Sequence, residues 1–173
     1  MADGIRGKQF EHFPEDVQKG ILLHRFIDTY TDSHDTFRQS TKRLHEKYHH
    51  YSGVIVDIMY DHFLAKNWEK YSDEKLDHFI NRFYRSLHEN YPILTEKTQN
   101  LMPTMIRENW LWSYQTIDGI QHILTQMDRR SKNQSKMQFA SQELKEFYPE
   151  FEREFDLFFK DVQAQSKQKL LSL

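Results

Sequence analysis

The sequence contains very few residues that interrupt helices, and this scarcity constrains its fold most strongly. Only five glycines and four prolines occur in 173 residues, which leaves little material for the tight turns of a β-sheet protein. The rest of the chain is rich in Leu, Lys, Glu, Gln and Arg, which favour helix. With no internal repeat or linker in sight, we expect an all-α fold in which a single compact helical domain spans residues 1–173.

Composition and charge exclude several classes of function. Hydrophobic residues make up 38% of the chain and charged residues 29%, which is typical of a soluble globular protein. The net charge of −2 provides no basic field for a nucleic acid. Without cysteine, disulfides and cysteine-based zinc sites are excluded. No apolar run approaches the ~20 residues of a membrane span and no signal peptide is visible, so we expect a cytoplasmic protein. The oligomeric state stays open.

Seven segments carry apolar residues at helical spacing, and we expect a helix or a helix pair in each. The segments are residues 12–32, 33–50, 51–72, 72–91, 95–112, 116–131 and 141–173. The third contains a β-branched run, Val54–Ile55–Val56, that also fits a buried strand, but the length of the segment favours a helix.

Individual residues indicate where some of these helices start and stop. Pro14 suits the first position of the first helix, and Ser33 is a candidate N-cap of the second. Pro92 should end the fourth helix, because the residue before a proline avoids helical geometry. Pro103 should interrupt or start the fifth segment, and Pro149 should kink or break the last one.

Two apolar segments carry the residues with the most chemical potential. His24, Asp28 and Asp32 follow one another at steps of four, so they share one face of a helix. The third segment repeats the spacing with Asp57 and Asp61 and adds His62. We expect the two stretches to converge in space, with four side chains meeting at their centre: His24, Asp28, Asp61 and His62.

Two interpretations of these stretches remain equally open from the residues alone. A buried carboxylate is costly unless it is paired, hydrogen-bonded or bound to a metal. Imidazole and carboxylate ligands together suit Mn²⁺, Fe²⁺ or Zn²⁺. Alternatively, each stretch forms a structural pair, either His with Asp or Asp28 with Arg25 or Arg38.

The other candidates favour structure over chemistry. His49 and His50 lie in a polar stretch and should be at the surface. The isolated histidines should be surface or capping residues: His12, His34, His45, His78, His88 and His122. Three aromatic residues should belong to the core: Trp110, Trp112 and Tyr114. The basic run at 128–136 should be a solvated loop, and the sequence has no glycine-rich phosphate loop or GxSxG motif.

Three stretches resemble the acyl carrier protein phosphodiesterases: "FPEDVQKGILLHRFIDTYTDSH", "RLHEKY…YSGVIVDIMYDHFLAKNW" and "GIQHILTQM". The resemblance covers most of the chain, from about Asp3 to beyond Met127. Its combination of FPxDVxxGIxxHRxID, TDxH and DxxxDHFL is far more specific than any of these motifs alone.

The resemblance implies a fold, a reaction and a cofactor. It implies a helical bundle distantly related to the HD-type metal-dependent phosphohydrolases. It also implies hydrolysis of 4′-phosphopantetheine from holo-acyl carrier protein, which yields apo-acyl carrier protein. The cofactor would be a divalent metal, Mn²⁺ in the first place, with Mg²⁺ or Fe²⁺ as alternatives.

The resemblance also implies a set of site residues. Asp3, in "ADGIRG", matches a short Ala-Asp motif of the family. Catalysis would rest on four residues: Asp3, His24, Asp28 and Asp61. The same four would bind the metal together with His62, and Asp32 and Asp57 would orient them. Arg6 and Arg25 are candidates for contact with the phosphate, because a guanidinium matches its oxygens.

The implied partner is a small acidic protein, so we expect basic side chains to contact it. One candidate patch is Arg6, Lys8 and Arg25, and the other is Arg129, Arg130, Lys132 and Lys136. Family members carry a segment before the Ala-Asp motif, where this sequence has Met1, and its absence should weaken metal binding and activity. Two alternative functions remain: a phosphohydrolase for a small nucleotide or phosphoester, and an inactive module that binds the carrier protein.

Overall fold

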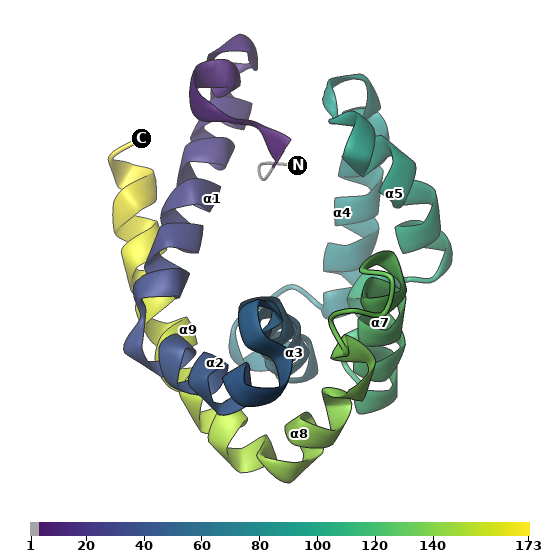
Figure 1. Ribbon diagram of the computed structural model, residues 1–173. Coiled ribbons are helices and arrows are strands. Elements are labelled where there is room, and N and C mark those ends of the chain that lie inside the picture. The colour runs from purple at the N-terminus through teal and green to yellow at the C-terminus, as the bar shows by residue number, and fades with distance from the viewer. Residues whose placement is uncertain (1–3) are drawn as a thin grey trace.

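Helix follows helix throughout the computed structural model, which describes residues 4–173 (Figure 1). No β-strand occurs in this range, so the predicted all-α fold is confirmed. The α-helices are α1 (Glu15–Ser33), α2 (Asp35–Tyr48), α3 (Ser52–Lys66), α4 (Leu76–Glu89), α5 (Glu96–Arg107), α6 (Trp110–Ser113), α7 (Ile117–Arg130), α8 (Ser141–Glu146) and α9 (Tyr148–Leu171). Short 3₁₀ helices are η2 (Gly7–His12), η3 (His49–Tyr51), η4 (Trp68–Lys70), η5 (Tyr91–Ile93) and η6 (Met137–Phe139).

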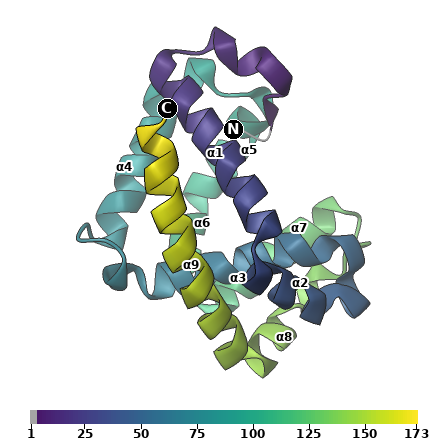
Figure 2. The same cartoon turned by 90° about the vertical axis from the view of Figure 1, so that its left-hand side faces the viewer.

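The helices form two arms that meet at α3 (Figures 1 and 2). One arm consists of α1 and α9, which pack against each other and against α2. The other arm holds α4, α5 and α6, and α6 connects it to α7. Helix α3 lies at the base and packs against α2, α7 and α9, so it joins the two arms. None of the helices in the described range is long and apolar enough to cross a membrane.

Helix α3 occupies the centre of the hydrophobic core. Ile55, Val56, Met59 and Phe63 are completely buried among side chains of α2, α7, α8 and α9. The β-branched run therefore lies in a helix and not in a strand, as the length of the segment predicted. Because α3 is apolar around most of its circumference, it can pack against helices on several sides.

A buried ion pair fastens α2 to α9 behind this core. Arg43 donates two hydrogen bonds to the carboxylate of Glu154, at 2.7 and 2.6 Å. The hydroxyl of Ser40 donates to the same carboxylate and lies 2.9 Å from the hydroxyl of Tyr60 on α3. Glu154 is only 2% exposed. The fully hydrogen-bonded arrangement is what makes a charge tolerable at this depth.

The structure corrects two predicted helix boundaries. His34, and not Ser33, is the N-cap of α2, because its Nδ1 accepts the backbone N–H of Thr36. Pro103 lies inside α5 without interrupting it. Its ring is exposed, so the carbonyl that lacks a helical partner can bond to water. The actual break follows at Asn109, whose backbone is left-handed with φ of 45°.

Other boundaries agree with the sequence. The last segment breaks before Pro149, which stands in the first turn of α9. The basic run at 128–136, predicted to be a solvated loop, is a loop only over residues 131–136, because α7 continues to Arg130 and Asp128 is buried. Among the three aromatic residues expected in the core, Trp112 is 48% exposed, so the prediction is wrong for this residue. Its neighbours on the short helix α6 face inward, whereas a four-residue helix cannot bury all of its sides.

Gly119 allows α7 to approach the end of α6 closely. A Cβ atom at this position would lie 1.9 Å from the carbonyl oxygen of Ser113. That oxygen belongs to the backbone, so it cannot move aside as a flexible side chain would. By contrast, a Cβ atom added at Gly20 on α1 would meet nothing within 4 Å.

We predict that Gly119→Ala lowers the free energy of unfolding by about 1–3 kcal/mol, the usual cost of overpacking. The matched control Gly20→Ala should raise it by about 0.5–1 kcal/mol, because alanine favours helix over glycine and the site is open. Urea denaturation of the three proteins measures both effects. Equal stability of Gly119→Ala and the parent would contradict the close approach of α6 and α7.

Candidate functional site

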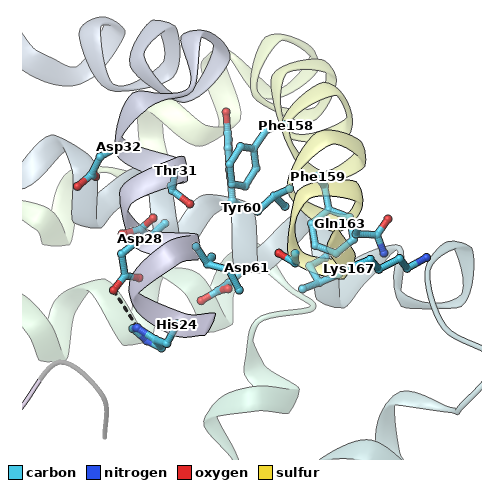
Figure 3. A pocket seen from close by; sticks show the side chains of 15 residues that line it. His24, Asp28, Thr31, Asp32, Tyr60, Asp61, Phe158, Phe159, Gln163 and Lys167 are labelled. Atoms are coloured by element: carbon cyan, nitrogen blue, oxygen red, sulfur yellow. Dashed lines mark ion pairs between the residues drawn. The ribbon is translucent and has the colours of Figure 1, made fainter. Parts of the chain in front are cut away.

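A cleft of about 840 Å³ opens between α1, α3 and α9 (Figure 3). From α1 it is lined by His24, Ile27, Asp28, Thr31 and Asp32. From α3 it is lined by Asp57, Tyr60, Asp61 and Leu64. From α9 it is lined by Phe158, Phe159, Val162, Gln163, Ser166 and Lys167. The two stretches singled out in the sequence therefore do meet, on opposite helices of one cleft.

The wall formed by α1 and α3 is acidic. Asp28 and Asp32 lie one helical turn apart on α1, and Asp57 and Asp61 have the same spacing on α3. All four side chains line the cleft and are exposed to the water inside it. The apolar faces of α1 and α3 pack into the protein, so the register of the two helices turns these carboxylates to the open side.

His24 and Asp28 form a pair within α1. The Nδ1 atom of His24 lies 2.8 Å from a carboxylate oxygen of Asp28 (Figure 3). The structural pairing that the spacing allowed is thus present, and it involves His24 instead of Arg25 or Arg38. This contact orients the imidazole at the edge of the cleft, as a carboxylate does for many reactive histidines.

Desolvation within the cleft and, to a lesser degree, the neighbouring carboxylates raise two pKa values. Burial and the charges of Asp32 and Asp28 raise the pKa of Asp57 to about 7. Burial and the charge of Asp57 raise the pKa of Asp61 to about 7, against a hydrogen bond from Tyr114 that lowers it. Since water reaches both side chains, it moderates the repulsion between them. Both groups can exchange a proton near neutral pH, which is a common property of catalytic carboxyls.

His62 does not line the cleft, and its role as a metal ligand stays a prediction. Its ring is only 2% exposed. Nδ1 lies 2.7 Å from the backbone carbonyl of Tyr114, and Nε2 lies 2.9 Å from the hydroxyl of Tyr148. Burial lowers the pKa of His62, so the neutral ring donates to the carbonyl and accepts from the hydroxyl. Both nitrogens are therefore engaged within the core.

The two arginines expected at the phosphate do not line the cleft either. Arg25 donates to the backbone carbonyl of Ile5 at 2.7 Å, and its guanidinium lies over the ring of Phe10. It fastens the N-terminal segment to α1. Arg6 is exposed beside η2, where its backbone N–H donates to Gln9. Asp3 lies outside the described residues, so its predicted role stays a prediction.

Sequence reasoning missed the third wall of the cleft. The aromatic residues Phe158 and Phe159 and the polar residues Gln163 and Lys167 come from α9, about a hundred residues away along the chain. The aromatic periodicity of the C-terminal segment indicated a buried helix, but no local signal indicated its neighbour. Tyr60 was also missed, because one aromatic residue within an apolar helix resembles any other core residue.

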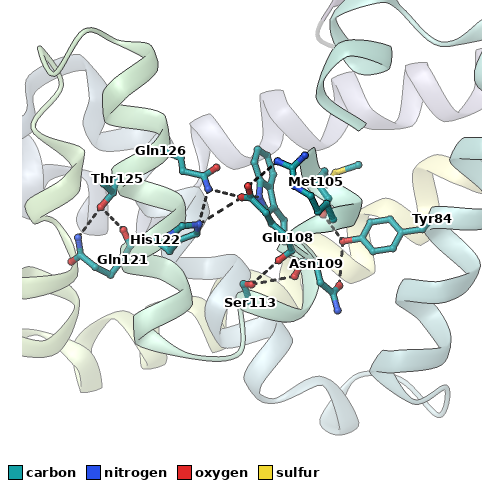
Figure 4. A network of polar contacts seen from close by, with 11 residues as sticks. Tyr84, Met105, Glu108, Asn109, Ser113, Gln121, His122, Thr125 and Gln126 are labelled. Atoms are coloured by element: carbon teal, nitrogen blue, oxygen red, sulfur yellow. Dashed lines mark hydrogen bonds and ion pairs between the residues drawn. The ribbon is translucent and has the colours of Figure 1, made fainter. Parts of the chain in front are cut away.

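A second polar cluster, at the corner between α5, α6 and α7, is structural (Figure 4). Glu108 accepts hydrogen bonds from Gln126 and from the indole of Trp110, which lower its pKa to about 2. His122 lies 3.6 Å from the same carboxylate. Tyr84 on α4 donates to the backbone of Met105 and so attaches the corner to the outer arm. Because the carboxylate is saturated by neighbouring side chains, this cluster holds helices together.

The cleft presents carboxylate oxygens, the type of donor atom that a hard divalent cation prefers. Carboxylate oxygens are preferred ligands of Mn²⁺ and Mg²⁺, and converging carboxylates repel one another unless a cation or protons neutralise them. Within residues 4–173, however, no three His, Asp or Glu side chains are grouped closely enough to hold a metal ion as they stand. Coordination by these residues would therefore require their side chains to turn toward a common point.

The comparisons with known proteins place the chain in a family. Residues 1–162 match the profile described as acyl carrier protein phosphodiesterase. The chain belongs to the acyl carrier protein phosphodiesterase family. Proteins of that name from Salmonella agona (strain SL483) and Salmonella newport (strain SL254) are each 29% identical over 172 residues, which are 99% of this chain and 89% of theirs. No solved structure matches the chain.

The matched region includes both acidic helices of the cleft and ends within α9. The family resemblance noted in the motifs of α1 and α3 is therefore confirmed over nearly the whole chain. Three residues that line the cleft lie beyond this region: Gln163, Ser166 and Lys167. The profile does not reach them, whereas the alignments with the Salmonella relatives span 99% of the chain.

We predict that stability falls as the pH rises through the range in which Asp57 and Asp61 titrate. An unfolded aspartate titrates near 4, whereas both groups titrate at about 7 in the folded protein. The folded state therefore binds protons that the unfolded state has released, and this stabilisation is lost as the pH passes about 7. Asp61→Asn removes one such group.

Urea denaturation at about pH 5 and pH 8 tests this prediction. The loss of unfolding free energy between the two pH values should be smaller in Asp61→Asn than in the parent. Asp73→Asn is a suitable control, because Asp73 is exposed in the turn before α4 and does not line the cleft. If the loss of unfolding free energy between the two pH values is the same in Asp61→Asn, in Asp73→Asn and in the parent, the pKa of Asp61 is not raised as described.

Proposed function

We propose that this protein hydrolyses the phosphodiester between the carrier serine and 4′-phosphopantetheine in holo-acyl carrier protein. The products would be apo-acyl carrier protein, with its serine hydroxyl restored, and free 4′-phosphopantetheine. The observation that carries the proposal is the cleft lined by four carboxylates, within the region that matches the acyl carrier protein phosphodiesterases. The name shared by the curated relatives supports the same substrate.

The two walls of the cleft suit the two parts of this substrate. Opposite the acidic wall, Phe158, Phe159 and Val162 of α9 provide an apolar surface. A flexible arm can lie along such a surface while its phosphodiester faces the acidic residues. Gln163 and Lys167 at the end of this wall offer polar contacts, and the lysine offers a positive charge to an anionic substrate.

We include a divalent cation, Mn²⁺ in the first place, in this proposal. Asp28 and Asp61 would hold it from opposite helices, with Asp32 and Asp57 beside them. When bound, such a cation polarises phosphoryl oxygens and lowers the pKa of a bound water. The presence of a cation is supported by the carboxylates that line the cleft, because a cation between them reduces the repulsion of their like charges.

The acidic residues and His24 provide the proton transfers that hydrolysis requires. As water attacks the phosphorus, the pair of His24 and Asp28 can take up its proton, because the carboxylate stabilises the imidazolium that forms. The bond from phosphorus to the serine oxygen then breaks, and that oxygen needs a proton. The imidazolium formed on His24 can supply this proton, which leaves Asp28 and Asp61 ionised as ligands of the cation.

We predict that Asp28→Asn and Asp61→Asn each lower kcat for holo-acyl carrier protein by about 10³-fold or more, because each removes a charge at the reacting centre but keeps the shape. Asp73→Asn should retain the activity of the parent, because its side chain lies outside the cleft. Mass spectrometry of the carrier protein in the presence of Mn²⁺ follows the loss of the phosphopantetheine arm.

The same assay separates the alternatives. Loss of the arm with the parent but not with the two cleft variants supports the proposal. If the parent leaves holo-carrier protein intact but hydrolyses a small phosphodiester, the protein is a phosphohydrolase of another specificity. If it binds the carrier protein without hydrolysing either substrate, it is an inactive binding module.

A further inference from the structure

We propose that a basic groove beside the cleft docks an acidic surface of the carrier protein. The groove, which we call the α2 groove, is formed by α2, η3 and the start of α3. It is lined by Asp32, Phe37, Arg38, Thr41, Lys42, His45, His49, His50 and Gly53. This inference rests on the proposed function, and it adds the place where the substrate protein is held.

Five of the nine residues that line the α2 groove have basic side chains, although most of its exposed surface is apolar. Arg38 and Lys42 carry positive charges, and the three histidines add ring nitrogens that can form hydrogen bonds with a partner. The chain turns sharply at His49, whose φ is 49°, and so brings η3 back against the end of α2. Phe37 lies on the buried floor, and Asp32 is the only acidic residue of the lining.

These charges are available to a partner, in contrast to the other cations of α2. Arg43 is bound to the buried Glu154, and Lys47 pairs with Glu143 on α8. Lys42, His45, His49 and His50 make no ion pair within residues 4–173. The groove thus presents an excess of positive charge on a protein whose net charge is −2, which is the local complementarity that an acidic partner requires.

The α2 groove borders the cleft at Asp32. This residue lines both hollows and its charge acts on Asp57 within the cleft. Arg38 donates to the backbone carbonyl of Asp32 at 2.9 Å, which fixes the ridge between them. A protein seated in the groove could therefore extend its modified serine across this ridge, so that the phosphodiester enters the acidic cleft.

The basic patches expected from the sequence border neither hollow. Arg25 is bound to the backbone of Ile5, and Arg130 lies over the ring of Trp110 at 5.1 Å. Arg6, Lys8, Arg129, Lys132 and Lys136 line neither the cleft nor the α2 groove. Charge complementarity close to the reacting centre thus favours the α2 groove as the docking surface.

The test is charge reversal of Lys42, with a matched lysine as control. Lys42→Glu should raise both KM and Kd for holo-carrier protein about fivefold or more at low salt and leave kcat nearly unchanged. Lys160→Glu reverses a charge on an exposed residue of α9 that lines neither hollow, and it should change both constants less than twofold. The effect of Lys42→Glu should shrink at high salt. Thermal unfolding confirms that both variants fold.

Binding and hydrolysis are measured separately, so that the two proposals can fail separately. Weaker binding by Lys42→Glu, with no hydrolysis by the parent, would support docking and contradict the enzymatic function. Hydrolysis by the parent with unchanged KM and Kd in Lys42→Glu would overturn docking in the α2 groove. An equal loss in Lys160→Glu would also overturn it, because the effect would then follow overall charge. Absence of any binding by the parent would overturn it as well.

Discussion

The buried carboxylate of Glu154 is the interaction on which the rest of the structure depends. It joins α9 to α2 through Arg43 and reaches α3 through Ser40 and Tyr60. Tyr60 stands between this network and the cleft, since its ring lines the cleft while its hydroxyl bonds to Ser40. Loss of one partner from such a pair costs about 3–5 kcal/mol. The same interaction that holds three helices together therefore also fixes the floor of the candidate site.

The cleft has an electrostatic cost that the fold must offset. Four carboxylates line the cleft, and desolvation together with the neighbouring charges raises the pKa values of Asp57 and Asp61 to about 7. A hydrophobic core around α3 and a saturated ion pair behind it supply the stability that tolerates this repulsion. An arrangement that lowers stability and concentrates one kind of charge in a cleft is typical of a functional site.

The sequence predicted the helices and the acidic wall because both depend on local spacing. Periodicity placed Asp28, Asp32, Asp57 and Asp61 on helix faces, and the apolar neighbours determined which face was open. The sequence could not predict the α9 wall, because contacts between distant segments leave no local pattern. It also could not show that His62 is buried away from the cleft, because the residue next to Asp61 points to another side of the helix. The relation to the HD-type phosphohydrolases stays a prediction.

The central claim is that α1 and α3 contribute carboxylates to one reacting centre. The most direct test is a double-mutant cycle with Asp28→Asn, Asp61→Asn and the double variant, measured as single-turnover hydrolysis of holo-carrier protein with Mn²⁺. Residues that act as a unit are not additive. The double variant should therefore lose no more activity than the more impaired single variant. If the two losses multiply instead, Asp28 and Asp61 act independently, and the cleft between α1, α3 and α9 is not one catalytic site.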